Sequence, residues 1–441
     1  MAEYDPLVSD TARSLTEDTL ASHEKNEMES MLTILTCGDA QDVFIIIQQI
    51  RKMLSTEKNP PIQEILDLGV LPTLADLFAV NQFKRDIAWI ISNIASGNQM
   101  QCHQAVQVNS IDIFCQCLNS GKEDLVVQGM MGLGNIAGND AHCRDQILIP
   151  EVIEKISEIR ENASEEFRHV HCWLISNLLN FKPIPGEPLT EKLLPVIKKY
   201  YDSNDEEMIG NAAWALFRLL QNEEDAEMIV RSGVIPKTIT LIMSPDQKIS
   251  NASSKLIKKI LKITGKFNEY LIGEGILNII PRSIKNKNQH IRKDTVDILS
   301  KLCENNTNAA YSVISLGILN RIIEMALKDI KEIRNGCIKT LCNIALSEND
   351  IIPIMMTEDF FPALLCVFRG NFQNLYELTI KTFKATFDYL EEATGHESAI
   401  IVYKNFEEQG GVTHLERILT SADGSLLKEI EILNHMLNRY K

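Results

Sequence analysis

A motif that recurs about every 42 residues constrains this chain more than any other feature of its sequence. NIASGN begins at Asn93, NIAGND begins 42 residues later at Asn135, and NIALSEN begins at Asn343, 208 residues further on and close to five more periods. Self-similarity of this length is the signature of a repeat protein, in which each unit buries its apolar face against its neighbours. We therefore expect one array of similar units.

The tryptophans and a column of turn residues keep the same period. Trp89 and Trp173 are two periods apart, Trp214 lies 41 residues beyond Trp173, and Met131 holds the intermediate position. A second column contains glycine in some units and other residues between them: Gly69, Gly233, Gly275 and Gly317, with Asn109, Glu151, Lys192 and Asp359. The two columns support the repeat independently of the NIA motif.

Each unit has the pattern of three helices. Apolar residues recur at three- and four-residue spacing, and the alternation typical of strands does not appear. A unit contains a short helix, a turn, an apolar helix such as VLPTLADLFAV and an amphipathic helix such as FKRDIAWIISNIA. This length and helix content are typical of armadillo and HEAT proteins. We predict an all-α, right-handed armadillo-repeat solenoid of about ten three-helix repeats over residues 36–441, preceded by an acidic, partly disordered segment at 1–35.

The segment GLGNIAG within residues 132–138 resembles a glycine-rich phosphate loop. That fingerprint requires a strand before it and the start of a helix after it, whereas the repeat places this segment inside a helical unit. We instead expect the small residues of this segment to lie where neighbouring helices pack closely. We also expect Gly138 to end a helix in the left-handed conformation, with Gly97 and Gly265 in the equivalent place.

Composition excludes several classes of function. The net charge of −16 disfavours binding to nucleic acid or anionic membranes and favours basic partners. The N-terminus lacks the apolar core of a signal peptide, and no apolar run approaches the length of a membrane span. Ten cysteines without a secretory signal indicate reduced thiols in the cytosol or nucleus.

No catalytic or metal-binding motif is present. Cys115 and Cys117 form C-x-C, and HVHCW contains His169, His171 and Cys172, but residues two apart on a helix face different directions. No second ligand pair follows at zinc-finger spacing, and the common hydrolase and P-loop signatures do not occur. We predict no metal, no cofactor and no enzymatic activity.

The paired Trp and Asn columns predict a surface for an extended basic peptide. Trp89 with Asn93, and Trp173 with Asn177, lie four residues apart and share one helical face. An Asn carboxamide has both a donor and an acceptor for a peptide backbone, and Trp rings can hold the stems and cations of Lys or Arg. Three rungs at Asn93, Asn135 and Asn177 match roughly six to nine extended residues. The alternative is that each Trp is core and each Asn a local cap.

RDIAWIISNIASG, VVQGMMGLGNIAG and HCWLISNLL resemble the third helices of the importin-α family of nuclear-import adaptors. The similarity extends from about residue 36 to the end and is most specific in the first four or five repeats. The family binds basic nuclear-localisation peptides along Trp and Asn columns, a Ser-Gly pair and acidic residues. The resemblance implies a peptide site formed by Trp89, Asn93, Ser96, Gly97, Asp86, Gln128, Asn135, Asn139, Asp140, Trp173, Asn177, Asn211 and Trp214.

Several positions in this site depart from the family pattern. Met131 replaces a tryptophan, and Cys102 stands where the family has a threonine. The aspartate that pairs with the key lysine aligns with Asn139, for which Asp140 or Asp86 are candidate substitutes. The family's second, C-terminal cargo site aligns with altered residues at Asp297, Lys301, Gly336 and Lys339, and with Asn343. Arg218 and the lysine-rich KLIKKILKITGK add positive charge, so we expect this second site to be degraded.

Residues 1–35 contain only Arg13 and Lys25 as basic side chains among more numerous acids. The resemblance implies a basic helix there that binds importin-β, so we expect a divergent member that lacks it and contacts importin-β, if at all, by a non-standard route. We predict a nuclear-import adaptor of the cytoplasm and nucleus that binds basic nuclear-localisation peptides and neither nucleic acid nor membrane. The alternative is a non-transport armadillo scaffold, β-catenin-like or an assembly factor, that binds another protein segment.

Overall fold

The fold is an armadillo-repeat solenoid. The computed structural model describes residues 30–56, 58–182, 189–420, 422 and 424–440, and all regular structure within these ranges is helical. The chain divides into two compact units, residues 1–219 (unit 1) and 220–441 (unit 2). Residues 30–37 are helical, whereas residues 1–29, most of the acidic segment predicted above, lie outside the described residues.

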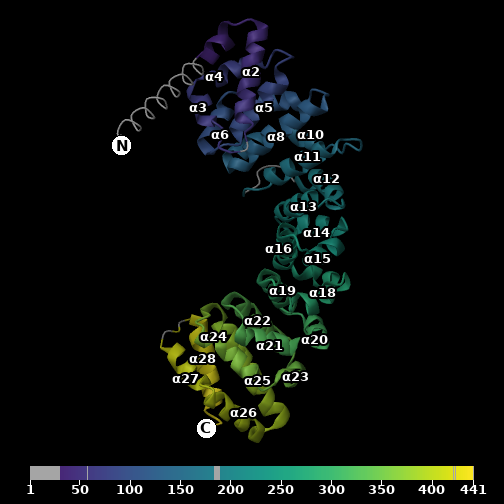
Figure 1. The fold of residues 1–441 in the computed structure, drawn as a ribbon. Helices are drawn as coiled ribbons and strands as arrows, with labels where there is room; N and C mark the ends of the chain where they lie inside the picture. Colours follow the sequence, from purple (N-terminus) through teal and green to yellow (C-terminus); the bar gives the residue numbers. More distant parts are fainter. Residues whose placement is uncertain (1–29, 57, 183–188, 421, 423, 441) are drawn as a thin grey trace, which may run out of the picture. The chain divides into compact units, whose positions relative to one another are not determined.

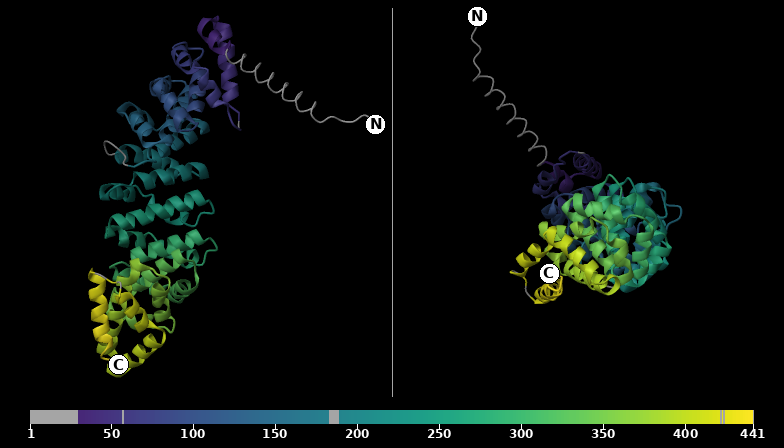
Figure 2. Two further views of the ribbon diagram at one scale, coloured as in Figure 1. Left: turned by 90° about the vertical axis from the view of Figure 1, so that its left-hand side faces the viewer. Right: turned by 90° about the horizontal axis from the view of Figure 1, so that it is seen from below.

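Ten helices of the described part hold the third position of a repeat, which confirms the predicted repeat architecture. They are α2 (Ala40–Leu54), α5 (Lys84–Ala95), α8 (Glu123–Asn139), α11 (Glu165–Leu178), α13 (Glu206–Leu219), α16 (Gln247–Ile263), α19 (Gln289–Leu302), α22 (Lys331–Ala345), α25 (Tyr376–Thr394) and α28 (Gly424–Leu437). In unit 1 each packs on the next from α2 to α13, and in unit 2 from α16 to α28. Within each unit the helices form successive layers (Figures 1 and 2).

The remaining helices supply the first and second positions. The first are α3 (Ile62–Asp67), α6 (Gln99–Gln107), α9 (Ala141–Ile147), α14 (Glu223–Arg231), α17 (Asn268–Gly273), α20 (Thr307–Ser315), α23 (Ile352–Met355) and α26 (His396–Glu408). The second are α4 (Val70–Leu77), α7 (Ser110–Leu118), α10 (Pro150–Ser157), α12 (Leu189–Tyr201), α15 (Ile235–Leu241), α18 (Ile276–Ser283), α21 (Leu319–Lys328), α24 (Phe360–Arg369) and α27 (Gly411–Leu419). Short 3₁₀ turns are η1 (Gly265–Phe267), η2 (Asn349–Ile351) and η3 (Gln373–Leu375).

The turn column is where the backbone requires positive φ. Gly69 and Gly275 precede α4 and α18 with φ of 70° and 88°, a region that side chains with a Cβ rarely adopt. Asn109 occupies the same turn before α7 with φ of 58°. Asn is one of the few other residues that tolerate this conformation, so the sharp bend between the first and second helices survives the loss of glycine.

The left-handed conformation expected at Gly97, Gly138 and Gly265 is wrong, because none of the three has positive φ. Gly138 lies inside α8, which continues to Asn139. The glycines of α8 instead allow close approach of neighbouring helices. A Cβ on Gly132 would lie 2.1 Å from the Phe114 ring, and one on Gly134 would lie 2.2 Å from the Trp173 ring. GLGNIAG is thus a helix-packing surface, as expected, and does not form a phosphate loop.

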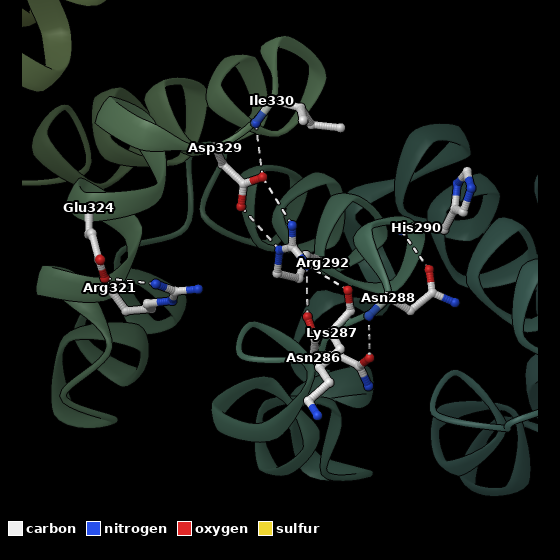
Figure 3. A network of polar contacts seen from close by, with 9 residues as sticks. All are labelled: Asn286, Lys287, Asn288, His290, Arg292, Arg321, Glu324, Asp329 and Ile330. Carbon is white, nitrogen blue, oxygen red and sulfur yellow. Dashed lines mark hydrogen bonds and ion pairs between the residues drawn. The ribbon is translucent and has the colours of Figure 1, made fainter.

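A half-buried ion pair also joins consecutive repeats. In unit 2, Arg292 donates from Nε and Nη2 to the two carboxylate oxygens of Asp329 at 3.1 and 3.0 Å (Figure 3). Its Nη1 donates to the carbonyls of Asn286 and Lys287, which fixes the loop before α19. Burial opposes ionisation of Asp329, but the hydrogen bonds from Arg292 outweigh it and lower the pKa of this carboxyl.

No single helix of the described residues is long and apolar enough to cross a membrane. Two bent pairs, Thr307–Ser315 with Leu319–Lys328 and Asn349–Met355 with Phe360–Arg369, reach that length and composition only when taken together.

Candidate functional site

Three asparagines form a ladder along α5, α8 and α11, which we call the asparagine ladder. Each carboxamide Nδ2 donates to a backbone carbonyl of the preceding third helix: Asn93 to Leu54 at 3.1 Å, Asn135 to Ser92 at 2.9 Å and Asn177 to Gly134 at 3.1 Å. The same contact recurs at one-repeat intervals because the stacked helices repeat. Each asparagine is therefore held in a fixed orientation by its neighbour.

The carboxamide oxygens of the ladder remain available. No donor among the described residues bonds the Oδ1 of Asn93, Asn135 or Asn177, and each of these half-buried side chains keeps some accessible surface on that oxygen. Asn93 and Asn177 also keep a second N–H. An acceptor beside a donor at intervals of one repeat is complementary to the N–H and C=O groups of an extended peptide.

The tryptophans lie one helical turn before the ladder asparagines and are half-buried. Trp89 precedes Asn93 on α5, and Trp173 precedes Asn177 on α11. The Trp173 ring packs directly on Gly134 of α8. Met131 holds the same phase on α8, where its Sδ is 3.9 Å from Gln128 Nε2. These positions form an apolar border along the ladder that can hold the aliphatic stems of Lys or Arg.

Arg51 is a residue of this face that the sequence interpretation missed. Its guanidinium lies 5.3 Å from the centroid of the Trp89 ring, and its Nη1 is 2.8 Å from Asp86 Oδ1. Asp86 is only 7% exposed. Asp86 was a candidate partner for a peptide lysine. In the structure it is instead paired with Arg51, a cation of its own chain. The available signal was that Arg51 precedes Asn93 by 42 residues, one repeat.

Asp140 is likewise engaged within the chain. Its carboxylate caps α9 by accepting from the Cys143 N–H at 2.8 Å, and it lies 2.7 Å from His103 Nε2 and 3.0 Å from Gln99 Nε2. Burial opposes its ionisation, but these hydrogen bonds outweigh burial and hold the pKa of Asp140 well below its usual range. Asp140 thus has little capacity to replace the aspartate that the resemblance places at Asn139.

Asn139, the last residue of α8, has the opposite character. Its Oδ1 is enclosed, and no described residue donates to it. A buried acceptor without a donor costs about 1–3 kcal/mol.

The other predicted residues lie on the same helices or beside them in unit 1. Ser96 ends α5 and donates to the Asn93 carbonyl at 2.7 Å. Gly97 packs on the Gln101 carboxamide, which closes the capping box of α6. Gln128 on α8 and Asn211 on α13 are buried, and Trp214 on α13 is half-buried. All thirteen predicted residues therefore lie between α5 and α13.

Arg218 takes the ladder position on α13. Its Nη1 donates to the Ser176 carbonyl at 2.7 Å and to the Ser176 Oγ at 2.9 Å, and its guanidinium lies 5.3 Å from the Trp214 ring centroid. Burial lowers the pKa of the Arg218 guanidinium. The inter-repeat contact of the ladder is thus kept with a different side chain.

Two clusters bring potential metal ligands within 4.8 Å of one another: His103, Asp140 and Cys143, and Glu165, His169 and Asp205. In each cluster the histidine and aspartate already pair, at 2.7 and 3.0 Å. Burial raises the pKa of the Cys143 thiol to about 12. These pairs engage the histidine and the aspartate of each cluster, and we assign no metal to either.

In unit 2 the Trp column carries charge and the ladder is reduced. Asn343 keeps the inter-repeat bond, donating to the Ser300 carbonyl at 2.7 Å. Asp297, in the Trp column, pairs with Lys293 at 2.9 Å and Lys258 at 3.3 Å. Lys301, in the Asn column, pairs with Glu304 at 2.7 Å. The charged groups of this face are largely compensated by one another, and no tryptophan borders them because Trp214 is the last in the chain.

Comparisons with known proteins agree with the helical repeat. No protein-family model matches the chain. It is 32% identical to importin subunit alpha-2 of Arabidopsis thaliana over 44% of this chain and 37% of that protein. It is 26% identical to importin subunit alpha-1a of Oryza sativa subsp. japonica over 62% of this chain and 53% of that protein. The chain is importin-α-like.

A further importin-α-like match is the probable importin subunit alpha-A of Dictyostelium discoideum, at 27% identity over 58% of this chain and 50% of that protein. The matches thus span about a third to a half of the relatives' length. A crystal structure of an engineered protein covers 93% of this chain and 98% of its own with a TM-score of 0.78 and 17% identity. That similarity concerns the fold alone.

Proposed function

We propose that this importin-α-like chain is a nuclear-import adaptor that binds basic nuclear-localisation peptides in extended form along the asparagine ladder of unit 1. The observation that carries the proposal is the regular set of open carboxamide oxygens on Asn93, Asn135 and Asn177. Each is fixed by a bond to the preceding repeat. Fixed polar groups lose little entropy when they bind a ligand.

The ladder supplies backbone recognition, and the residues beside it supply the preference for basic side chains. The half-buried Trp89 and Trp173 offer apolar surface to aliphatic stems and π faces to cations. Asn139, which the resemblance aligns with the lysine-pairing aspartate of the family, is the last residue of α8 and the candidate position for one peptide lysine. The net charge of −16 favours the approach of cationic segments.

The transport role extends the proposal beyond peptide binding. By analogy with the importin alpha subunits that it matches, we place the protein in the cytoplasm and nucleus. We further propose that it cooperates with importin-β by a surface other than a basic helix in residues 1–35. Asp86 and Asp140 are assigned structural roles because Arg51 and His103 already pair with them.

The deciding experiment titrates a fluorescent lysine-rich peptide of about seven residues against the full chain and follows anisotropy. Saturable binding that weakens as salt rises is expected, since partly exposed charges contribute. A peptide with every lysine replaced by glutamine is the control. Absence of saturable binding to the basic peptide would favour the alternative, a non-transport armadillo scaffold.

A further inference from the structure

Five positions of unit 1, one on each third helix, align with the asparagine ladder, and the first and the last of them are arginines. The five third helices carry Arg51, Asn93, Asn135, Asn177 and Arg218 at these positions, at steps of 42, 42, 42 and 41 residues. The three central residues are the asparagines with open oxygens. The two terminal residues present a guanidinium instead, and both guanidinium groups lie over a tryptophan.

Arg218 keeps the hydrogen bond that joins a ladder asparagine to the preceding repeat, but it offers no acceptor to a bound peptide. It donates to the Ser176 carbonyl at 2.7 Å, as Asn177 donates to Gly134 at 3.1 Å. A guanidinium has five donors and no acceptor, so this position cannot accept the N–H of a bound peptide. Its charge, 5.3 Å from the Trp214 centroid, also occupies one face of the ring that a ligand cation would use.

The opposite end is closed in a related way. The Arg51 guanidinium lies 5.3 Å from the Trp89 centroid and is held there by Asp86 at 2.8 Å. One face of Trp89 therefore has a cation from the chain itself. In contrast, no cation of the described residues lies over Trp173. Trp173 lies on α11, between the helices that carry Arg51 and Arg218.

We propose that Arg51 and Arg218 end the peptide site of unit 1, so that its ligand is one short basic segment read by three rungs. The inference rests on the proposed function and specifies its ligand. Repeats stack roughly 8–10 Å apart and an extended residue spans about 3.3 Å. A segment of roughly six to nine residues therefore fills the site, and Arg218 offers no acceptor for a fourth rung.

The test compares three fluorescent peptides by anisotropy at one physiological salt concentration. One is a seven-residue lysine-rich core, and the others carry three additional lysines at the N-terminal or the C-terminal end. The proteins are the wild type, Arg218→Asn and Arg231→Asn. Arg231 is an exposed arginine of α14 in unit 2, so its substitution changes the net charge equally without touching the ladder.

For the wild type and Arg231→Asn, both extended peptides should bind within twofold of the core. For Arg218→Asn, one of the two should bind at least fivefold more tightly than the core, because a carboxamide at this position supplies an acceptor and completes a fourth rung. Arg218→Gln, which can still donate to the Ser176 carbonyl, should behave alike and guards against misfolding of the first variant.

Two outcomes contradict the inference separately from the proposed function. If the core peptide binds the wild type and an extended peptide already gains fivefold, Arg218 does not end the site. The same conclusion follows if the affinity of the extended peptides relative to the core peptide is the same for both Arg218 variants as for Arg231→Asn. Failure of the core peptide to bind the wild type would instead reject the proposed function itself, and the inference with it.

Discussion

The Asn177 carboxamide donates to the Gly134 carbonyl at 3.1 Å, 43 residues earlier in the chain, and the lack of a side chain at Gly138 leaves room for this contact. A Cβ on Gly138 would lie 3.2 Å from Asn177 Nδ2. One side chain thus both joins two repeats and presents a fixed oxygen to solvent. Because stability and recognition use different atoms of the same carboxamide, substitutions in the ladder affect both.

Substitution of Trp89 and Asn93 by alanine should reduce affinity for a lysine-rich peptide at least thirtyfold while the chain stays helical. The change removes one apolar border and one rung. The lost bond to the Leu54 carbonyl is expected to cost about 1 kcal/mol. Anisotropy titration and a thermal melt by circular dichroism measure the two effects. Asn119→Ala, which removes an exposed bond to Glu151, is the control and should leave affinity unchanged. A collapse of the melting temperature would instead indicate that Trp89 and Asn93 are core residues.

Asn139→Asp should increase affinity for a peptide with a central lysine by about three- to tenfold. The resemblance aligns Asn139 with the aspartate that pairs with the key lysine, and a carboxylate forms a stronger, charge-assisted bond with an ammonium than a carboxamide does. A peptide with norleucine in place of that lysine should gain nothing. Equal gains for both peptides would show that Asn139 does not contact the ligand.

A bipartite basic peptide should bind no more than about threefold more tightly than its longer cluster alone. In unit 2 Asp297 is paired with Lys258 and Lys293, and Lys301 and Lys339 occupy positions where a ligand cation would lie. Competition titration of the two peptides measures the difference. Density for a second lysine-rich peptide across Lys301 and Asn343 would overturn this expectation.

The stability of unit 1 should decrease between pH 7.5 and pH 5 through His171. Burial lowers the pKa of His171 to about 4 from an ordinary 6.5, and the neutral ring bonds the Tyr200 hydroxyl and the Ile156 carbonyl. The unfolded chain takes up the proton first, so stability present above pH 6.5 is lost as pH falls toward 4, by about 2 kcal/mol at pH 5.

Thermal melts at both pH values should show a smaller decrease for His171→Phe than for the wild type. Tyr200→Phe keeps the imidazole and serves as the control, and it should retain the pH dependence. An equal decrease in wild type and His171→Phe would exclude His171 as the responsible group.

The sequence by itself determined the repeat, the helical class and the phases of the Trp and Asn columns. These features depend on local periodicity, and residues four apart share a helical face wherever the helix lies. The tolerance of Asn109 in a turn that is elsewhere glycine is also a local property. The prediction for Gly138 was wrong because a glycine near a helix end has the same sequence signal whether it supplies positive φ or close approach. Only the position of Asn177 in the next repeat shows that Gly138 serves close approach.

Only the tertiary structure decided which polar groups are open to a ligand. Arg51 and Asp86 are 35 residues apart, and His103 and Asp140 are 37 apart, so no local rule pairs them. Arg218 lies in the ladder phase, but its contact with the Ser176 carbonyl became evident only when the helices were stacked. Long charged side chains can reach several partners, and the geometry of the neighbouring repeat selects one. For this reason the sequence predicted where the site lies, and the packing of repeats determined which of its atoms are available to bind.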